Sequence, residues 1–135
     1  MLLPKLLAAQ PRVGVLTISA TKLGKEHLRA AGVPRERLGD VVVQGVDPKG
    51  EFATRILGNQ PELDLALARA DVVAAAAALK AREPSLTDVV LECTNMPPYR
   101  DAITEVTGLK TWCLLDDERL FRPFQALREP YPCSR

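Results

Sequence analysis

The fold of this chain is decided by one stretch, Val89-Val90-Leu91-Glu92-Cys93-Thr94-Asn95-Met96-Pro97-Pro98-Tyr99. An apolar, partly β-branched run ends abruptly at Glu92, a polar turn follows, and the proline pair opens a predicted helix. A strand, a polar turn and a helix in this order are typical of open α/β proteins, which bind ligands beyond the carboxyl ends of their strands. Cys93 lies in this turn, where the N–H groups of a following helix favour the reactive thiolate over the thiol.

Two interpretations of Cys93 are open from these residues alone. It is either a reactive thiol or an inert core cysteine at the end of a buried strand, since free cysteine is among the most buried residue types. Thr94, Asn95 and the prolines are also ordinary residues at the start of a helix. The combination of these residues indicates a functional site more than any one of them does.

The rest of the chain alternates between predicted strands and helices. Strands are expected over residues 12–18, 40–46, 86–92 and 111–115, each rich in Val, Leu or Ile. Helices are expected after a cap at Ser19 or Thr21, over residues 50–57, from Pro61 to about Arg82, over 97–107, and in a final stretch to about Leu127. Strands that alternate with helices imply right-handed crossovers. We therefore predict a three-layer α/β sandwich with a four-stranded parallel sheet.

A chain of 135 residues fits one domain, expected over residues 11–128 after a short lead-in at 1–10. Within the long predicted helix, the run from Ala74 to Ala78 has side chains small enough to lie close against a sheet. Three prolines, at 123, 130 and 132, interrupt the polar C-terminal part. Residues 129–135 are expected to be a disordered tail.

Composition excludes several classes of function. The formal net charge is +1, with 47% hydrophobic and 26% charged residues, so there is no electrostatic footprint for nucleic acid. No apolar run is long enough to span a membrane, and the first ten residues do not resemble a signal peptide. The three cysteines include no Cys-x-x-Cys pair, and His27 is not spaced from them as a zinc ligand would be. We expect a cytoplasmic protein with reduced thiols and no metal or cofactor.

The segment from Leu91 to Tyr99 resembles the second cysteine motif of the aspartate/glutamate racemase superfamily, in the branch with Glu-Cys-Thr-Asn rather than Gly-Cys-Thr-His. Three weaker matches follow the same order along the chain: Val13-Gly14-Val15-Leu16-Thr17, His27-Leu28 with Ala30-Ala31-Gly32-Val33, and Gly50-Glu51-Phe52. The resemblance covers roughly residues 11–112. It implies that the chain corresponds to the second, C-terminal half of a two-domain racemase.

The resemblance also implies a mechanism. These racemases move a proton at the carbon next to a carboxylate without a cofactor, using one cysteine from each of two domains. Cys93 would be the general base in one direction and the general acid in the other. Thr94 and Asn95 would orient the substrate carboxylate, and Thr17 and Ser19 are weaker candidates from a neighbouring loop. For Ser19, a role as a helix cap is the alternative.

The sequence shows no second motif of this kind. Cys113 is predicted inside a strand and Cys133 in the tail, so neither replaces the missing thiol. The chain is then an inactive single domain, a homodimer that brings two copies of Cys93 together, or a one-base enzyme like the decarboxylases of the superfamily. A non-catalytic ligand-binding or interaction module on the same fold is the alternative from another class. The substrate would be an amino acid, a hydantoin or a malonate-like carboxylate.

Overall fold

The computed structural model describes residues 2–116. Their centre is a parallel sheet with the strand order β2-β1-β3-β4. The strands are β1 (Val13–Thr17), β2 (Val41–Gly45), β3 (Asp88–Leu91) and β4 (Lys110–Trp112). Every residue of β1 is buried, as expected for a central strand covered on both faces. The predicted four-stranded parallel sheet is confirmed.

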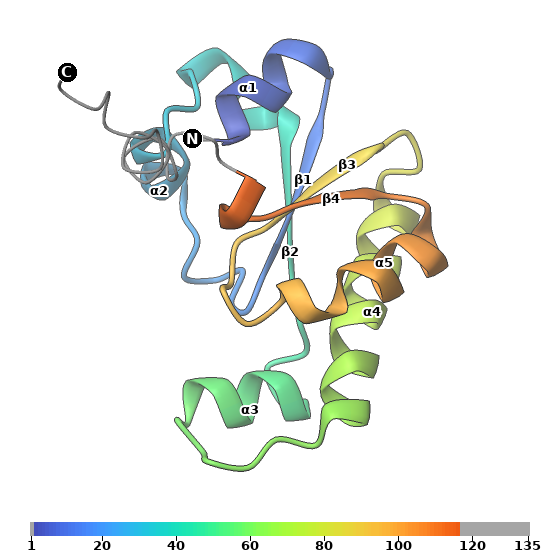
Figure 1. Cartoon of the computed structure of the whole chain (residues 1–135). Helices are drawn as coiled ribbons and strands as arrows, with labels where there is room; N and C mark the ends of the chain where they lie inside the picture. Colours follow the sequence, from blue (N-terminus) through green and yellow to red (C-terminus); the bar gives the residue numbers. More distant parts are fainter. Residues whose placement is uncertain (1, 117–135) are drawn as a thin grey trace, which may run out of the picture.

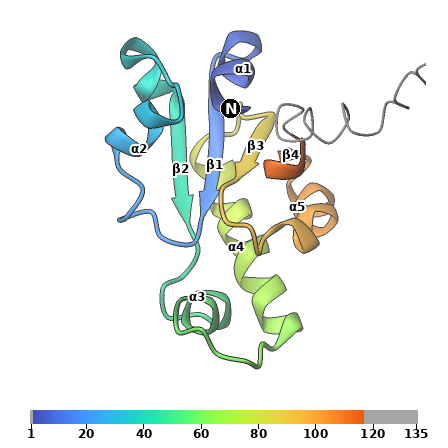
Figure 2. The ribbon, with the colours of Figure 1, turned by 60° about the vertical axis from the view of Figure 1, so that its left-hand side comes forward.

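Helices cover both faces of the sheet, which makes three layers (Figure 1). One face carries α3 (Glu51–Leu57), α4 (Leu65–Arg82) and α5 (Arg100–Thr107), and the other carries α1 (Leu2–Ala9) and α2 (Lys25–Ala30). Figure 2, turned from the first view, shows α4 behind and below the strands, α2 beside β2, and α1 next to the start of β1. Two buried clusters, one on each face, form the core.

The long helix α4 packs closely on the sheet because the contacting residues are small. A Cβ atom added to Gly14 of β1 would come within 2.8 Å of Leu79 Cδ2, so this strand position has no room for a larger residue. Ala75 and Ala76 are buried, whereas Ala74 and Ala78 lie on the exposed side. The expectation that the alanine run lies against the sheet is therefore correct for one face of the helix.

The first turn of α4 begins later than predicted. The Asp64 carboxylate accepts a hydrogen bond of 3.0 Å from the backbone N–H of Leu67, which makes Asp64 the N-cap and leaves Pro61 outside the helix. The helix ends at Arg82, as predicted. The helix over residues 50–57 is also confirmed as α3, and Gly108, in the left-handed region with φ of 72°, ends α5.

Within the expected lead-in at 1–10, Leu2–Ala9 form helix α1. Leu3, Leu6 and Leu7 are buried in the cluster on that face of the sheet. Arg37, in the 3₁₀ segment Arg35–Asp40, donates hydrogen bonds of 2.8 Å to the carbonyl of Leu7 and 3.0 Å to that of Gln10. These bonds satisfy backbone acceptors left free at the end of a helix. The segment is part of the packed domain.

The predicted cap of the second helix is wrong. Neither Ser19 nor Thr21 caps it, because α2 begins only at Lys25 with Gly24 as its N-cap. The chain between β1 and α2 is a loop in which the two hydroxyls lie 3.1 Å apart. The expected final helix to about Leu127 and the tail at 129–135 lie outside the described residues. Within residues 2–116, no helix is long and apolar enough to cross a membrane.

Candidate active site at the carboxyl ends of the strands

The turn after β3 is held by backbone bonds at both ends. The N–H of Glu92 donates to the carbonyl of Leu16 at 2.9 Å, which extends the pairing with β1 by one residue. The N–H of Met96 then donates to the carbonyl of Cys93 at 3.1 Å, and the Met96 side chain is fully buried in the core. The turn that carries Cys93 is therefore fixed to the sheet on one side and to the core on the other.

Cys93 lines a pocket of about 310 Å³, which we call the thiol pocket. Thr94, Pro97 and Pro98 line it as well, and so does Cys113. The Cys93 side chain is largely buried, at 9% exposure, and the Asn95 amide lies 3.9 Å from its Sγ atom in a long N–H···S contact. A nearly buried thiol that opens on a pocket can reach a bound molecule while bulk water is kept away.

The helix predicted over residues 97–107 is confirmed in extent, but its first turn is 3₁₀ rather than α. Pro97–Tyr99 form a single 3₁₀ turn, and α5 begins at Arg100. Thr94 and Asn95 therefore lie in the turn rather than at the first residues of a helix, and the contact to the Cys93 sulfur comes from the Asn95 side chain. Tyr99 is buried and meets the Phe52 ring edge-on at 6.1 Å between centroids.

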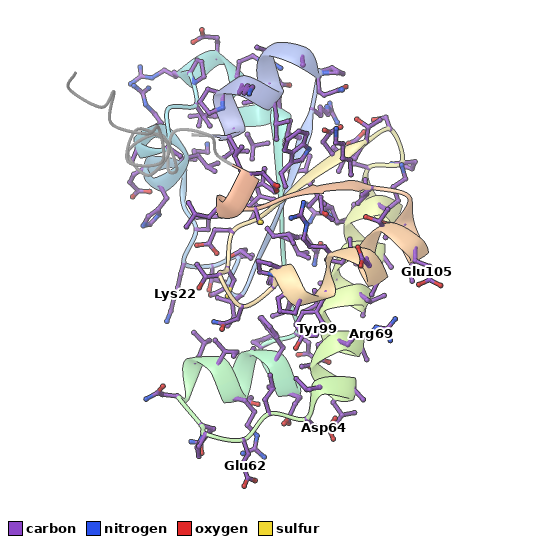
Figure 3. All side chains as sticks on the ribbon, viewed as in Figure 1. Lys22, Glu62, Asp64, Arg69, Tyr99 and Glu105 are labelled. Carbon is purple, nitrogen blue, oxygen red and sulfur yellow. The ribbon has the colours of Figure 1, made fainter. Side chains whose placement is uncertain are left out.

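Thr94 and Asn95 are exposed and line a second space of about 570 Å³, the outer cavity. Arg69 of α4 lines it too, and Figure 3 shows Arg69 on that helix close to Tyr99. A guanidinium group is well suited to bind a carboxylate. No local sequence pattern points to Arg69, because a helix position 26 residues before Asn95 is placed here only by the packing of α4.

The Thr17 hydroxyl, at the end of β1, is already engaged. It donates to Glu92 Oε2 at 2.8 Å and accepts from the N–H of Ser19 at 3.3 Å. Thr17 is almost fully buried, at 2% exposure, so it holds the Glu92 carboxylate in place. The Ser19 side chain contacts Thr21 instead. Of the two weaker candidates, Thr17 contacts Glu92 with its hydroxyl, and Ser19 contacts Thr17 with its backbone N–H.

The prediction that Cys113 lies inside a strand is wrong. Strand β4 ends at Trp112, so Cys113 follows the strand end and lies at the same edge of the sheet as Cys93. Arg100 Nη1 donates to Cys113 Sγ at 3.5 Å, and Arg100 also binds Asp116 at 3.0 Å. The strand was predicted too long because the apolar run continues through Leu115, where the chain turns into a 3₁₀ segment, Leu114–Asp116.

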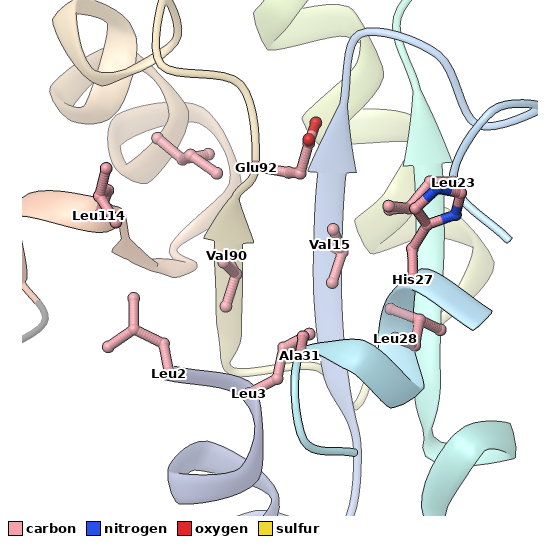
Figure 4. A pocket seen from close by; sticks show the side chains of 11 residues that line it. Leu2, Leu3, Val15, Leu23, His27, Leu28, Ala31, Val90, Glu92 and Leu114 are labelled. Atoms are coloured by element: carbon pink, nitrogen blue, oxygen red, sulfur yellow. The ribbon is translucent and has the colours of Figure 1, made fainter. Parts of the chain in front are cut away.

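A third space of about 420 Å³, the apolar chamber, lies on the opposite face of the sheet between α1 and α2 (Figure 4). Val15 and Val90 form its floor, and leucines from both helices form its walls. Its polar lining residues are His27 and Glu92. His27 is exposed, and its Nδ1 atom accepts the N–H of Gly24 at 3.1 Å.

Neighbouring spaces share lining residues. Glu92 and Leu114 line both the thiol pocket and the apolar chamber, and Thr94 lines both the thiol pocket and the outer cavity. The thiol pocket with Cys93 therefore borders both other spaces, of which the outer cavity carries Arg69 and Asp101 among mainly apolar residues and the chamber carries the Glu92 carboxylate at its edge. Within residues 2–116, no group of three or more His, Cys, Asp or Glu side chains is placed to hold a metal ion.

Comparison with known proteins gives one informative resemblance. The chain is 29% identical over 117 residues to a dimethylsulfoniopropionate lyase of Durusdinium sp. clade D. The match covers 82% of this chain and 38% of that protein, so the chain spans about two fifths of the length of the relative. No protein-family description matches the chain, and no solved structure matches it. The chain therefore resembles part of a lyase and has the edge-of-sheet site of an α/β protein.

Proposed function

We propose that this domain carries a lyase-type site in which Cys93 removes the proton next to a carboxylate. The supporting observation is the position of Cys93 itself, a nearly buried thiol at the carboxyl end of a central strand that opens on the thiol pocket. As a thiolate it is a general base of the kind this reaction needs. The likeness to a lyase supports an elimination rather than a racemisation.

The chemistry of dimethylsulfoniopropionate fits a single base. The compound is a carboxylate with a dimethylsulfonium group on the β carbon. When a thiolate takes the proton from the α carbon, the electron pair forms the α–β double bond, and the bond from the β carbon to sulfur breaks. The products are acrylate, neutral dimethyl sulfide and a protonated Cys93. Atoms and charge balance without an oxidant or a cofactor.

Elimination requires fewer acid/base groups than racemisation does. Racemisation returns a proton to the opposite face of the carbon and needs a second acid there, whereas elimination removes one proton from one face. The superfamily resemblance of the Glu-Cys-Thr-Asn turn is compatible with both outcomes, because both begin with the same proton removal. Decarboxylation with protonation by one thiol is the related one-base reaction.

Residues of the outer cavity can bind the carboxylate of such a substrate. Arg69, Thr94 and Asn95 line the outer cavity and offer a guanidinium, a hydroxyl and an amide, and the lining also includes one carboxylate, Asp101. These donors pair well with carboxylate oxygens. A carboxylate held there would leave the adjacent carbon in the thiol pocket, since Thr94 borders both spaces.

Proton NMR in heavy water tests the proposal with the full chain. We expect acrylate and dimethyl sulfide to form from dimethylsulfoniopropionate, and the rate to fall at least about 100-fold in Cys93→Ser, the usual loss when a general base is removed. Cys133→Ser is the matched control for the loss of a thiol and should leave the rate unchanged.

Aspartate, glutamate and a hydantoin are the comparison substrates in the same experiment. Deuterium wash-in at their α carbons without elimination from the sulfonium compound would make the chain racemase-like instead. Elimination that survives in Cys93→Ser would contradict the role of this thiol. Binding of the carboxylates without any turnover would identify a ligand-binding module that keeps the fold.

A further inference from the structure

Glu92 has a defined orientation at the edge of the apolar chamber. The buried Thr17 hydroxyl binds its Oε2 atom at 2.8 Å, and its backbone N–H is paired to Leu16. Figure 4 shows the Glu92 side chain at the end of β3, above the floor formed by Val15 and Val90. Both ends of the residue are therefore tied to β1, so the carboxylate stays at the chamber's edge.

Among the residues that line the chamber, Glu92 alone carries a carboxylate and His27 is the other polar one. His27 Nδ1 is engaged by the backbone N–H of Gly24 at 3.1 Å. The described residues that line the chamber include no lysine or arginine that would pair with Glu92. The chamber as a whole is thus an apolar space with a net negative edge.

This combination selects one kind of chemical group. The negative edge favours a cation, but the leucine and valine walls offer no acceptors for the N–H groups of an ammonium or a guanidinium. A sulfonium or quaternary ammonium group has only methyl or methylene groups around its charge. It can contact the apolar walls with its methyl groups and the carboxylate with its charge, and no hydrogen bond is lost.

The thiol pocket with Cys93 borders both the outer cavity and the apolar chamber, which indicates how a bound substrate would be oriented. On the basis of the proposed function, a substrate carboxylate lies toward Thr94 and its α carbon lies near Cys93. The next part of the molecule then extends past Glu92, which borders the thiol pocket and the chamber alike. We propose that Glu92 and the apolar chamber recognise the cationic group of an onium carboxylate and so determine substrate specificity.

A matched pair of ligands tests this recognition without any turnover. 3-(Trimethylammonio)propionate and 4,4-dimethylpentanoate have nearly the same shape and carboxylate, but only the first has a cationic centre. Their dissociation constants are measured by NMR titration with Cys93→Ser in the full chain, so that neither ligand reacts. The cationic ligand should bind about tenfold tighter, as expected for a charge pair near the protein surface.

Two variants test whether Glu92 and the chamber cause this difference in binding. Glu92→Gln keeps an oxygen that can accept the Thr17 hydrogen bond but removes the charge, so the two ligands should then bind equally. Ala31→Leu places a larger side chain in the chamber and should weaken both ligands at least about fivefold, because it occupies the space that their methyl groups need. Circular dichroism confirms that each variant is folded.

The proposal is overturned if the cationic and neutral ligands bind equally to the Glu92 protein, if neither binds, or if Ala31→Leu leaves the binding of both unchanged. A preference that persists in Glu92→Gln would also overturn it. Binding is measured separately from reaction, so the two proposals can fail separately. A cation preference without elimination would reject the lyase function alone, and elimination without a cation preference would reject the recognition site alone.

Discussion

The two faces of the sheet are covered to very different extents. On one face, α3, α4 and α5 close a core in which Leu79, Val72 and Phe52 have no exposed surface. On the other face, α1 and α2 leave the chamber of about 420 Å³ over Val15 and Val90. The closed face supplies the packing that holds the strand ends in place, and the incomplete helix layer on the open face provides space for a ligand.

The largest change in the free energy of unfolding is expected for a substitution on the closed face. Leu79→Ala removes a fully buried side chain beside Gly14 and should lower the free energy of unfolding by about 2–5 kcal/mol, from lost burial and the cavity left behind. Urea unfolding measures the change. Leu67→Ala on the same helix, where the side chain is 55% exposed, is the control and should stay within about 0.5 kcal/mol. Equal losses of stability in Leu79→Ala and Leu67→Ala would contradict a tightly packed core on this face of the sheet.

A leucine added to each face of the sheet should change the stability of the protein in opposite directions, by an intermediate amount. Ala76→Leu inserts a large side chain into the closed face and should destabilise the protein by about 1–3 kcal/mol. Ala31→Leu inserts the same side chain into the chamber and should stabilise it by about 0.5–2 kcal/mol, as cavity filling commonly does. Thermal or urea unfolding of both variants decides. Destabilisation of similar size at both positions would contradict the presence of free space on the open face.

The smallest effect concerns Tyr99, which the closed face buries. Burial raises the pKa of Tyr99, so the folded protein keeps this proton at a pH where the unfolded chain has begun to lose it. The unfolded chain then binds fewer protons, and the free energy of unfolding falls as pH rises through about 10. Tyr99→Phe should make this alkaline loss of stability shallower. Unfolding of the two proteins at about pH 8 and about pH 11 measures the difference, and identical losses would contradict it.

The strands were predictable because each is a short, nearly continuous apolar run, and such runs are buried in a parallel sheet. The helix starts were less predictable. Ser19 and Thr21 have the chemistry of caps, yet the second helix starts only at Lys25. Several residues can cap a helix locally, so tertiary contacts choose among them.

Helix α1 is encoded by the periodic spacing of its leucines. Leu3, Leu6 and Leu7 are spaced to share one helical face, and that face is buried. Pro4, in the first turn, is tolerated because its missing N–H has no partner there in any case. The helix is short, and it depends on the cluster over the sheet and on Arg37 at its end. Short helices of this kind owe their stability to packing.

The sequence by itself determined the parallel α/β sheet and the polar turn with Cys93 at a strand end, because hydrophobic runs and turn residues act locally. Only the tertiary structure brought Thr17 to Glu92, Arg69 to the outer cavity, and Cys113 to the thiol pocket. The open chamber beside Glu92 also results from the tertiary structure. The physical reason is that these relations join residues far apart in the chain, and they depend on strand order, strand length and helix packing, which no local pattern encodes.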